Sequence, residues 1–439
     1  MRKSGYFFWA LAYVTFTVLW VGCGSYYLDD AQNELRSSFT ERDYDTASEL
    51  LEEYEQEEIY RQRDFVLMNL ERGAVHHFSG NYERSNQYFT EAEHEIENLF
   101  GTSLSRNLRA FIINDYALEY SGEDYEDIYL NAFKSLNYMH LGDFDAALVE
   151  ARRMSFKMER LDEHYRGLAE SLARQDTTDQ VTWEAGDTNI ENSAMGHYLA
   201  AVLYSKTDRP DNARIELDRT RVALEDQRAI GANPDVTDNL LQKVAEPESY
   251  NVLLKGFAGR SPHKEENEFR VFIPQEDFYI RFALPSLKTW ETEVSTVQAV
   301  VNDTLDLPMK MIEEMDRVAE EVYKVGEPIV YGRSFVRSFL KAFGGRELTQ
   351  RVKEESRALG GIMNVLGIAS QESSERADLR AWQTLPGKAY TNLLHLPEGS
   401  HRVKIEYLDN NGRILFYEEQ QLDITESNPL QVMQTIYSN

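Results

Sequence analysis

The chain has 439 residues, 42% of them hydrophobic, and 46 Lys and Arg against 75 Asp and Glu give a formal net charge of −29. This acidic balance argues against nucleic acid and anionic lipid head groups as partners, because both would be repelled. Length and apolar content allow two domains with real cores. The single cysteine, Cys23, excludes an intramolecular disulfide, and with no nearby His it makes a poor zinc site.

The first 22 residues predict a signal peptide. Arg2 and Lys3 precede an uncharged, aromatic-rich run that ends in Gly22, directly before Cys23. This layout resembles the bacterial lipoprotein signal, in which a small residue precedes a cysteine that is lipidated and becomes the mature N-terminus. Trp20 departs from the pattern, since Leu is usual at that place. The alternative is an uncleaved membrane anchor near the ~20-residue span requirement. Both readings put the remaining chain outside the cytoplasm.

Four later stretches share one pattern: a turn, an aromatic residue or Pro two positions on, a small residue three later and an apolar residue four later. This spacing predicts a helix start followed by helical periodicity. The stretches begin at Arg42, Ser79, Leu141 and Thr207.

Three of these stretches can be aligned on Gly80, Gly142 and Asp208. Small residues then share positions in the upstream helices (Gly73, Ser135, Ala201) and in the downstream helices (Ser85, Ala147, Ala213). Small residues let two helices cross closely. The pattern resembles the tetratricopeptide repeat (TPR).

The alignment predicts a mainly α fold that begins with a TPR-like helical solenoid over residues 23–225. The aligned turns are 62 residues apart (142 − 80) and 66 residues apart (208 − 142), so additional helices, such as one at 160–175, must intervene between 34-residue units. An irregular helical bundle is the alternative.

The composition of the sequence changes after residue 225. Residues 226–248 are turn-rich and predict an exposed linker between two domains. Strands are predicted at 250–259, 269–274 and 278–285, helices at 305–345 and 347–367, and a β-hairpin over 401–424 with Asn411-Gly412 as its turn. Residues 249–439 therefore predict a smaller α+β C-terminal domain with antiparallel hairpins.

Landmarks at 120–154, 256–266, 331–343 and 375–403 look like those of an uncharacterised family of bacterial tetratricopeptide-repeat lipoproteins. Members of that family tend to sit beside lipoproteins similar to the curli secretion channel and to the penicillin-binding protein activator. The resemblance implies a non-enzymatic, lipid-anchored role in an envelope assembly, with envelope proteins, including neighbouring lipoproteins, as partners and no cofactor. Gly24, rather than Asp, after Cys23 favours the outer membrane.

A partner groove is expected on the concave face of the solenoid, which the first helix of each pair lines. Aromatic and Met side chains there would give adaptable contacts to a peptide or helix. The predicted groove residues are His77, Phe78, Tyr129, Met139, His140, Met195 and Tyr198. The alternative is that these side chains pack against intervening helices.

Arg333, Arg337 and Lys341 stand four apart and predict a basic stripe on one helical face, suited to an acidic partner or a lipid phosphate. The alternative is a solvated or internally paired face. Charged residues between 375 and 380, directly before Trp382, predict internal salt bridges that join helix to sheet.

Neither a catalytic motif nor a metal-ligand spacing is recognisable in the sequence. The second functional hypothesis is nevertheless a periplasmic enzyme acting on peptidoglycan or glycan. It would require paired carboxylates converging in a cleft of the C-terminal domain.

Overall fold

The computed structural model describes residues 23–103, 116, 118–175, 182–273, 278–343, 377–426 and 428–439. The fold is mixed α+β, with a helical N-terminal part and a C-terminal part rich in antiparallel strands. The predicted signal peptide and the helix predicted at 347–367 lie outside the described residues. The helices of the N-terminal part are α2 (Cys23–Thr40), α3 (Tyr44–Gln56), α4 (Phe65–Phe78), α5 (Tyr82–Ser103), α6 (Asp124–His140), α7 (Phe144–Glu159), α8 (Leu161–Gln175), α9 (Ala194–Lys206), α10 (Pro210–Ala229) and α11 (Asp238–Val244).

Four turns between these helices have the same backbone geometry. The second residue after each first helix has a positive φ: 64° at Arg42, 82° at Gly80, 76° at Gly142 and 55° at Asp208. In each turn the next N–H bonds a carbonyl five residues back, at 2.8–2.9 Å, which satisfies an orphan carbonyl of the helix end. These are the four turns that the sequence pattern predicted, so the prediction of helix pairs α2–α3, α4–α5, α6–α7 and α9–α10 is confirmed.

The shared small residues lie where paired helices cross. A Cβ atom on Gly73 would be 2.4 Å from the Phe89 ring, so α4 and α5 can approach this closely only at a glycine. The Ser85 hydroxyl donates to the Gly73 carbonyl at 2.7 Å, and the Ser135 hydroxyl donates to the Ala147 carbonyl at 2.9 Å. These bonds satisfy buried hydroxyls in a way that apolar packing alone would not.

The strands of the C-terminal part form a sandwich of two four-stranded sheets. One sheet has the order β10-β1-β7-β6, with β1 parallel to β10, and the other has the antiparallel order β5-β4-β8-β9. Their shared core includes Leu254 on β1, Ala299 on β4 and Ile405 on β8. The bounds are β1 (Val252–Ala258), β4 (Thr296–Val301), β5 (Leu305–Pro308), β6 (Lys310–Glu313), β7 (Lys388–Leu394), β8 (Gly399–Leu408), β9 (Ile414–Ile424) and β10 (Gln431–Tyr437).

The predicted hairpin is confirmed: β8 and β9 pair through a turn in which Gly412 has a φ of 78°. The helix predicted over 305–345 is partly wrong, because β5 and β6 occupy its first residues and α12 (Met315–Phe343) begins only after them. Edge strands this short carry too little alternation to be recognised from sequence.

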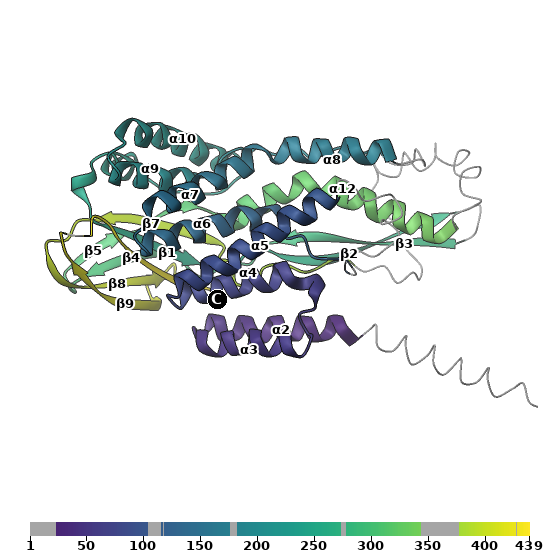
Figure 1. Ribbon diagram of the computed structural model, residues 1–439, viewed down its shortest axis with the longest axis horizontal. Helices are drawn as coiled ribbons and strands as arrows, with labels where there is room; N and C mark the ends of the chain where they lie inside the picture. Colours follow the sequence, from purple (N-terminus) through teal and green to yellow (C-terminus); the bar gives the residue numbers. More distant parts are fainter. Residues whose placement is uncertain are drawn as a thin grey trace, which may run out of the picture.

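A single apolar core joins the helical part to the sandwich. The cluster extends from Leu28 on α2 to Ile436 on β10, and the helices lie along the face of the β10-β1-β7-β6 sheet that the second sheet leaves free (Figure 1). β1 is central: Leu254 points into the sandwich while Leu253 and Phe257 point to the helices, as strand alternation requires.

The exposed linker expected at 226–248 is therefore corrected. Leu241 and Val244 of α11 are buried at 2% and 0% exposure, and Asp235 pairs with Lys310 of β6 at 2.9 Å. This turn-rich segment packs against both parts of the molecule, because its few apolar side chains are buried in the core.

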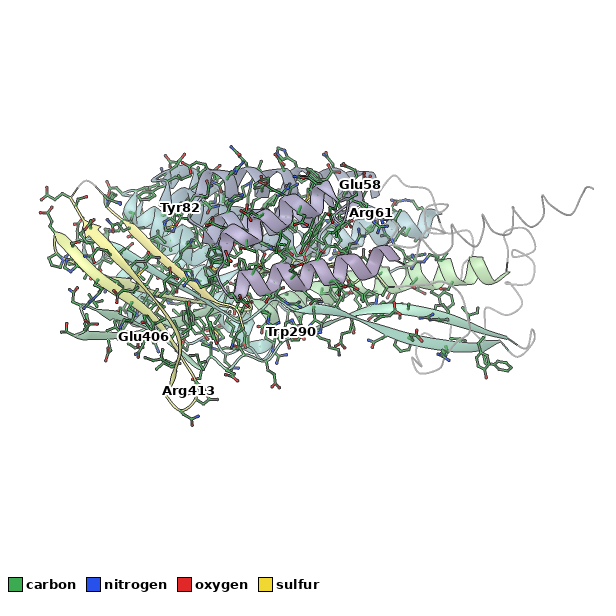
Figure 2. The ribbon with its side chains drawn as sticks, turned by 90° about the horizontal axis from the view of Figure 1, so that it is seen from below. Glu58, Arg61, Tyr82, Trp290, Glu406 and Arg413 are labelled. Atoms are coloured by element: carbon green, nitrogen blue, oxygen red, sulfur yellow. The ribbon has the colours of Figure 1, made fainter. Side chains whose placement is uncertain are left out.

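A long arm extends from the body. It consists of the paired strands β2 (His263–Ile273) and β3 (Phe278–Lys288), together with α12 and α8 (Figures 1 and 2). Phe282 of β3 stacks on Phe335 of α12 with ring centroids 5.4 Å apart, and Leu172 of α8 packs with Val336 of α12. The arm is thus a packed unit rather than a loose extension.

Candidate functional site

The predicted groove residues lie at the interface between the helices and the β10-β1-β7-β6 sheet. His77, Tyr129, Met139, Met195 and Tyr198 are at most 2% exposed, and Phe78 and His140 are half-buried. The Phe78 ring is 5.9 Å from the Phe257 ring of β1. The open groove is therefore corrected: the chain's own sheet covers the helix face on which these residues lie, and this contact buries apolar area of both the helices and the sheet.

Several polar groups of this interface pair with one another. The Tyr129 hydroxyl donates to the Glu313 carboxylate at 2.9 Å, and the same carboxylate accepts the Met195 N–H at 2.7 Å. His77 lies 2.6 Å from the Asn137 side-chain oxygen, and burial lowers the pKa of His77 to about 3. The Glu313 contacts therefore link α6 and α9 to the sheet, and the His77 contact links α4 to α6, so these groups are not presented to a partner.

Lys255 of β1 is a fully buried cation in this interface. Its side chain is 0% exposed, and its amino group has no hydrogen-bond partner among the described residues. Burial lowers the pKa of Lys255 to about 7, with nearby Glu313 opposing the shift. Sequence reasoning missed this residue, since a single Lys within an apolar strand gives no signal of which face it occupies.

The predicted basic stripe on α12 does not form an exposed surface. Arg337 is 1% exposed, and Arg333 lines a pocket between α12 and β3. The side chain of Lys341 lies outside the described residues. The stripe is corrected for its described members: spacing of four put them on one face, but that face packs against the rest of the molecule.

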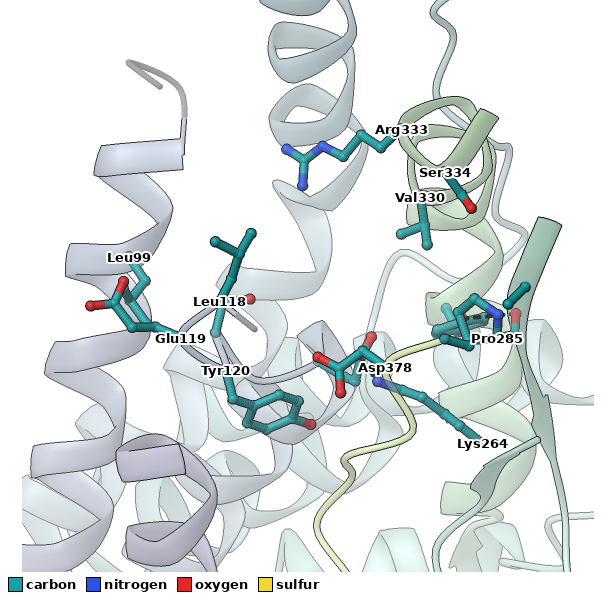
Figure 3. A pocket seen from close by; sticks show the side chains of 15 residues that line it. Leu99, Leu118, Glu119, Tyr120, Lys264, Pro285, Val330, Arg333, Ser334 and Asp378 are labelled. Carbon is teal, nitrogen blue, oxygen red and sulfur yellow. Dashed lines mark hydrogen bonds and ion pairs between the residues drawn. The ribbon is translucent and has the colours of Figure 1, made fainter. Parts of the chain in front are cut away.

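The pocket has a volume of about 170 Å³. Figure 3 shows Asp378 and Lys264 next to one another, with Arg333 reaching in from α12. Lys264 forms an ion pair with Glu123, and Asp378 pairs with Arg380 at 2.6 Å. Burial alone would raise the pKa of Asp378, but Arg380 holds it below its usual value. An ionised, paired carboxylate cannot donate a proton, so the pocket gives the glycan-hydrolase hypothesis no general acid at this residue.

Residues 377–387, here called the strap, thread between the pocket and the helices. Arg380 is 2% exposed and pairs with Asp64 at 2.8 Å, and its guanidinium also donates to the Leu118 carbonyl at 3.1 Å. This confirms the predicted internal salt bridge for Asp378 and Arg380, while residues 375 and 376 lie outside the described residues.

Two buried carboxylates of the helices hold the strap backbone. Glu126 accepts the Trp382 N–H at 2.7 Å, and Glu71 accepts the Gln383 N–H at 2.8 Å and the Thr384 hydroxyl at 2.6 Å. Burial raises the pKa of each carboxyl to about 7. Sequence reasoning missed both residues, because an isolated Glu on a helix is usually solvated.

A second buried ionic cluster joins α5, α6 and α7. Glu93, 1% exposed, lies 2.6 Å from the Lys134 amino group and 2.8 Å from that of Lys157. Burial alone would raise the pKa of Glu93, but Lys157 and Lys134 hold it well below its usual range. Among the described residues, no group of His, Cys, Asp and Glu is arranged to hold a metal ion.

Exposed apolar side chains gather on the outer helices α7 and α10. Val149 and Phe156 of α7 are 53% and 54% exposed, and Ile215 and Val222 of α10 are 46% and 51% exposed. These four residues are called the outer apolar surface below. An ion pair at 2.8 Å between Arg209 and Asp145 holds the starts of the two helices together. The repeat alignment could have identified these residues, because it places Val149 at the position of Ile215 and Phe156 at the position of Val222.

Cys23 begins α2, and its side chain lies outside what the structure describes. Among the described residues, none of the helices combines the length and apolar character needed to cross a membrane. No family model, curated protein or solved structure matches the chain.

Proposed function

We propose that the chain is a lipid-anchored, non-enzymatic protein of the bacterial cell envelope that binds a partner protein through the outer apolar surface. The lipoprotein-like signal before Cys23 supports the anchor and the envelope location, with the outer membrane as its site. The equivalent turns and helix crossings support a TPR-like repeat array.

The observation that carries the proposal is a repetition of exposed apolar residues. Val149 and Ile215 are 66 positions apart, and so are Phe156 and Val222, which is the offset of their repeats. Single exposed apolar residues are ordinary, but here the same two repeat positions are apolar and exposed on both α7 and α10.

The equivalent positions on α5 show that exposed apolar residues at these positions are not a general property of the repeat. There the residues are Gln87 and His94, both exposed and polar. The apolar character is thus confined to α7 and α10 and is not required by helix pairing. Because the concave face is filled by the sheet, the outer face is where a partner can reach the repeats.

Site-specific photo-crosslinking in the native host tests the partner surface. A photoreactive phenylalanine analogue replaces Phe156 in one strain and Gln87 in the control strain. We expect an adduct with one envelope protein from position 156 and none above background from position 87. Equal adducts at both positions, or none at position 156, would overturn the proposed surface.

A pair of double variants strengthens this test. Phe156→Ser with Val222→Ser should abolish capture of that same protein while the far-UV spectrum stays unchanged, and Gln87→Ser with His94→Ser should leave capture intact. The anchor is tested separately by mass spectrometry, which should find an acylated N-terminal Cys23. An intact Met1 in the native protein would remove the lipid anchor from the proposal.

A further inference from the structure

The far end of the arm carries a pair of exposed aromatic rings. Phe272 of β2 and Tyr279 of β3 are partners in the strand register, and their ring centroids are 4.8 Å apart. They are 39% and 43% exposed. The neighbouring Ile280 and Phe282 are only 5% and 6% exposed. Among the described residues of the arm, the packing that buries Ile280 and Phe282 therefore ends at this pair.

The arm carries these rings away from the body. The strand register extends from His263↔Lys288 to Ile273↔Phe278, which at about 3.3 Å per residue is roughly 35 Å of paired strand. In Figure 1 the strands run outward beyond the sandwich, and Figure 2 shows the same from a perpendicular direction. Exposed rings on such an extension are placed to contact something beyond the body of the protein.

The start of α2 lies on the side of the molecule toward which the arm points (Figure 1). Residues 1–22, which contain the apolar run, precede α2 and lie outside the described residues. An acyl chain on Cys23 would emerge at the start of α2, on this side of the molecule. The start of α2 and the far ends of β2 and β3 then lie toward the same side of the molecule.

We infer that Phe272 and Tyr279 contact the interfacial region of the bilayer that holds the lipid on Cys23. The inference rests on the lipid anchor of the proposed function. Tyrosine suits this depth, because its ring is apolar and its hydroxyl can stay in the head-group region. An uncharged contact also suits a chain of net charge −29, whose acidic surface would be repelled by anionic head groups.

The lipid and the rings have different effects on binding. Acyl chains hold the protein at the membrane but leave its orientation free. Once the anchor is in place, the second contact is intramolecular in effect, so two rings of modest affinity suffice to fix the orientation. The arm would then hold the outer apolar surface at a set angle to the membrane.

The single cysteine makes the test direct. Acylation consumes the Cys23 thiol, so Tyr279→Cys in the lipidated full-length protein gives one free thiol for an environment-sensitive fluorophore. The labelled protein is reconstituted in phosphatidylethanolamine–phosphatidylcholine vesicles that carry a nitroxide quencher at shallow depth. Tyr417→Cys is the matched control, because Tyr417 is 55% exposed on β9, at the opposite end of the molecule (Figure 1).

We expect several-fold stronger quenching at position 279 than at position 417, and the same result for Phe272→Cys. Equal quenching at the arm and at the control position would overturn the inference. Mass spectrometry before reconstitution keeps the two proposals apart. A non-acylated protein refutes the anchor, whereas an acylated protein with an unquenched arm refutes the membrane contact alone.

Discussion

Removing the Arg380 side chain should destabilise the protein strongly. Arg380 is 2% exposed and is held by ion pairs to Asp64 at 2.8 Å and Asp378 at 2.6 Å. In Arg380→Ala the Asp64 carboxylate, 1% exposed, would stay buried with only the longer ion pair to Arg63 at 3.7 Å, and Asp378 would lose its partner in the strap. Breaking a buried pair on one side costs about 3–5 kcal/mol, and we expect a loss of unfolding free energy in that range.

Equilibrium urea unfolding, followed by tryptophan fluorescence, measures this loss. Trp382 is a suitable probe, since it lies two residues from Arg380 and its indole contacts the Phe89 ring at 5.5 Å. Arg413→Ala is the matched control: its side chain is 71% exposed and pairs with Asp409 at 3.2 Å. Exposed pairs contribute about 0–1 kcal/mol, so the control should stay near wild type.

A triple variant separates charge from lost packing. Asp64→Asn and Asp378→Asn with Arg380→Met leave none of the three groups charged and keep much of the side-chain volume, so the triple variant should recover most of the stability lost in Arg380→Ala. The reasoning is refuted if Arg380→Ala costs under about 1 kcal/mol, or no more than Arg413→Ala.

Four further expectations concern single features of the fold. Burial raises the folded-state pKa of Glu71 to about 7 from 4.5, so the unfolded chain ionises first and stability falls as pH rises from about 5 to 7. Glu71→Gln should therefore gain up to about 3 kcal/mol relative to wild type between pH 5 and pH 8 in urea unfolding; an unchanged difference would contradict the assignment. Gly73→Ala should cost about 1–3 kcal/mol, because its Cβ would lie 2.4 Å from a buried ring, whereas Gly167→Ala, with open space around it, should be neutral or stabilising by thermal melting. Tyr198→Ala should lose about 3–5 kcal/mol, since the side chain is 0% exposed, and a melting temperature near wild type would restore the open groove. Limited proteolysis should spare residues 226–248, which pack against both parts of the chain, and early cleavage there would argue for separate domains.

Several features of the fold could be predicted because they depend on local chemistry. Gly80 and Gly142 marked turns that need a positive φ, and Asn411-Gly412 marked the hairpin turn. Gly73 and Ser85 marked a close helix crossing, since only small residues fit there. Each signal lies within a few residues of the structure it specifies.

The candidate sites were less predictable. Glu71 and Glu126 look like ordinary helix surface residues until the strap, more than 250 positions away in sequence, brings backbone N–H donors to them. The outer apolar surface was readable in principle from the repeat offset. It needed the structure to show that those positions stay exposed.

The sequence by itself determined the helix pairs, their turns and crossings, the β8–β9 hairpin and the presence of internal salt bridges in the charged segment before Trp382. Hydrophobic periodicity indicates which face of a helix is buried, but it does not indicate which other element covers that face. Only the tertiary structure decided that the helix face with Tyr129 and Tyr198 packs on the chain's own sheet. That choice follows from long-range burial of apolar area, which a local pattern does not encode.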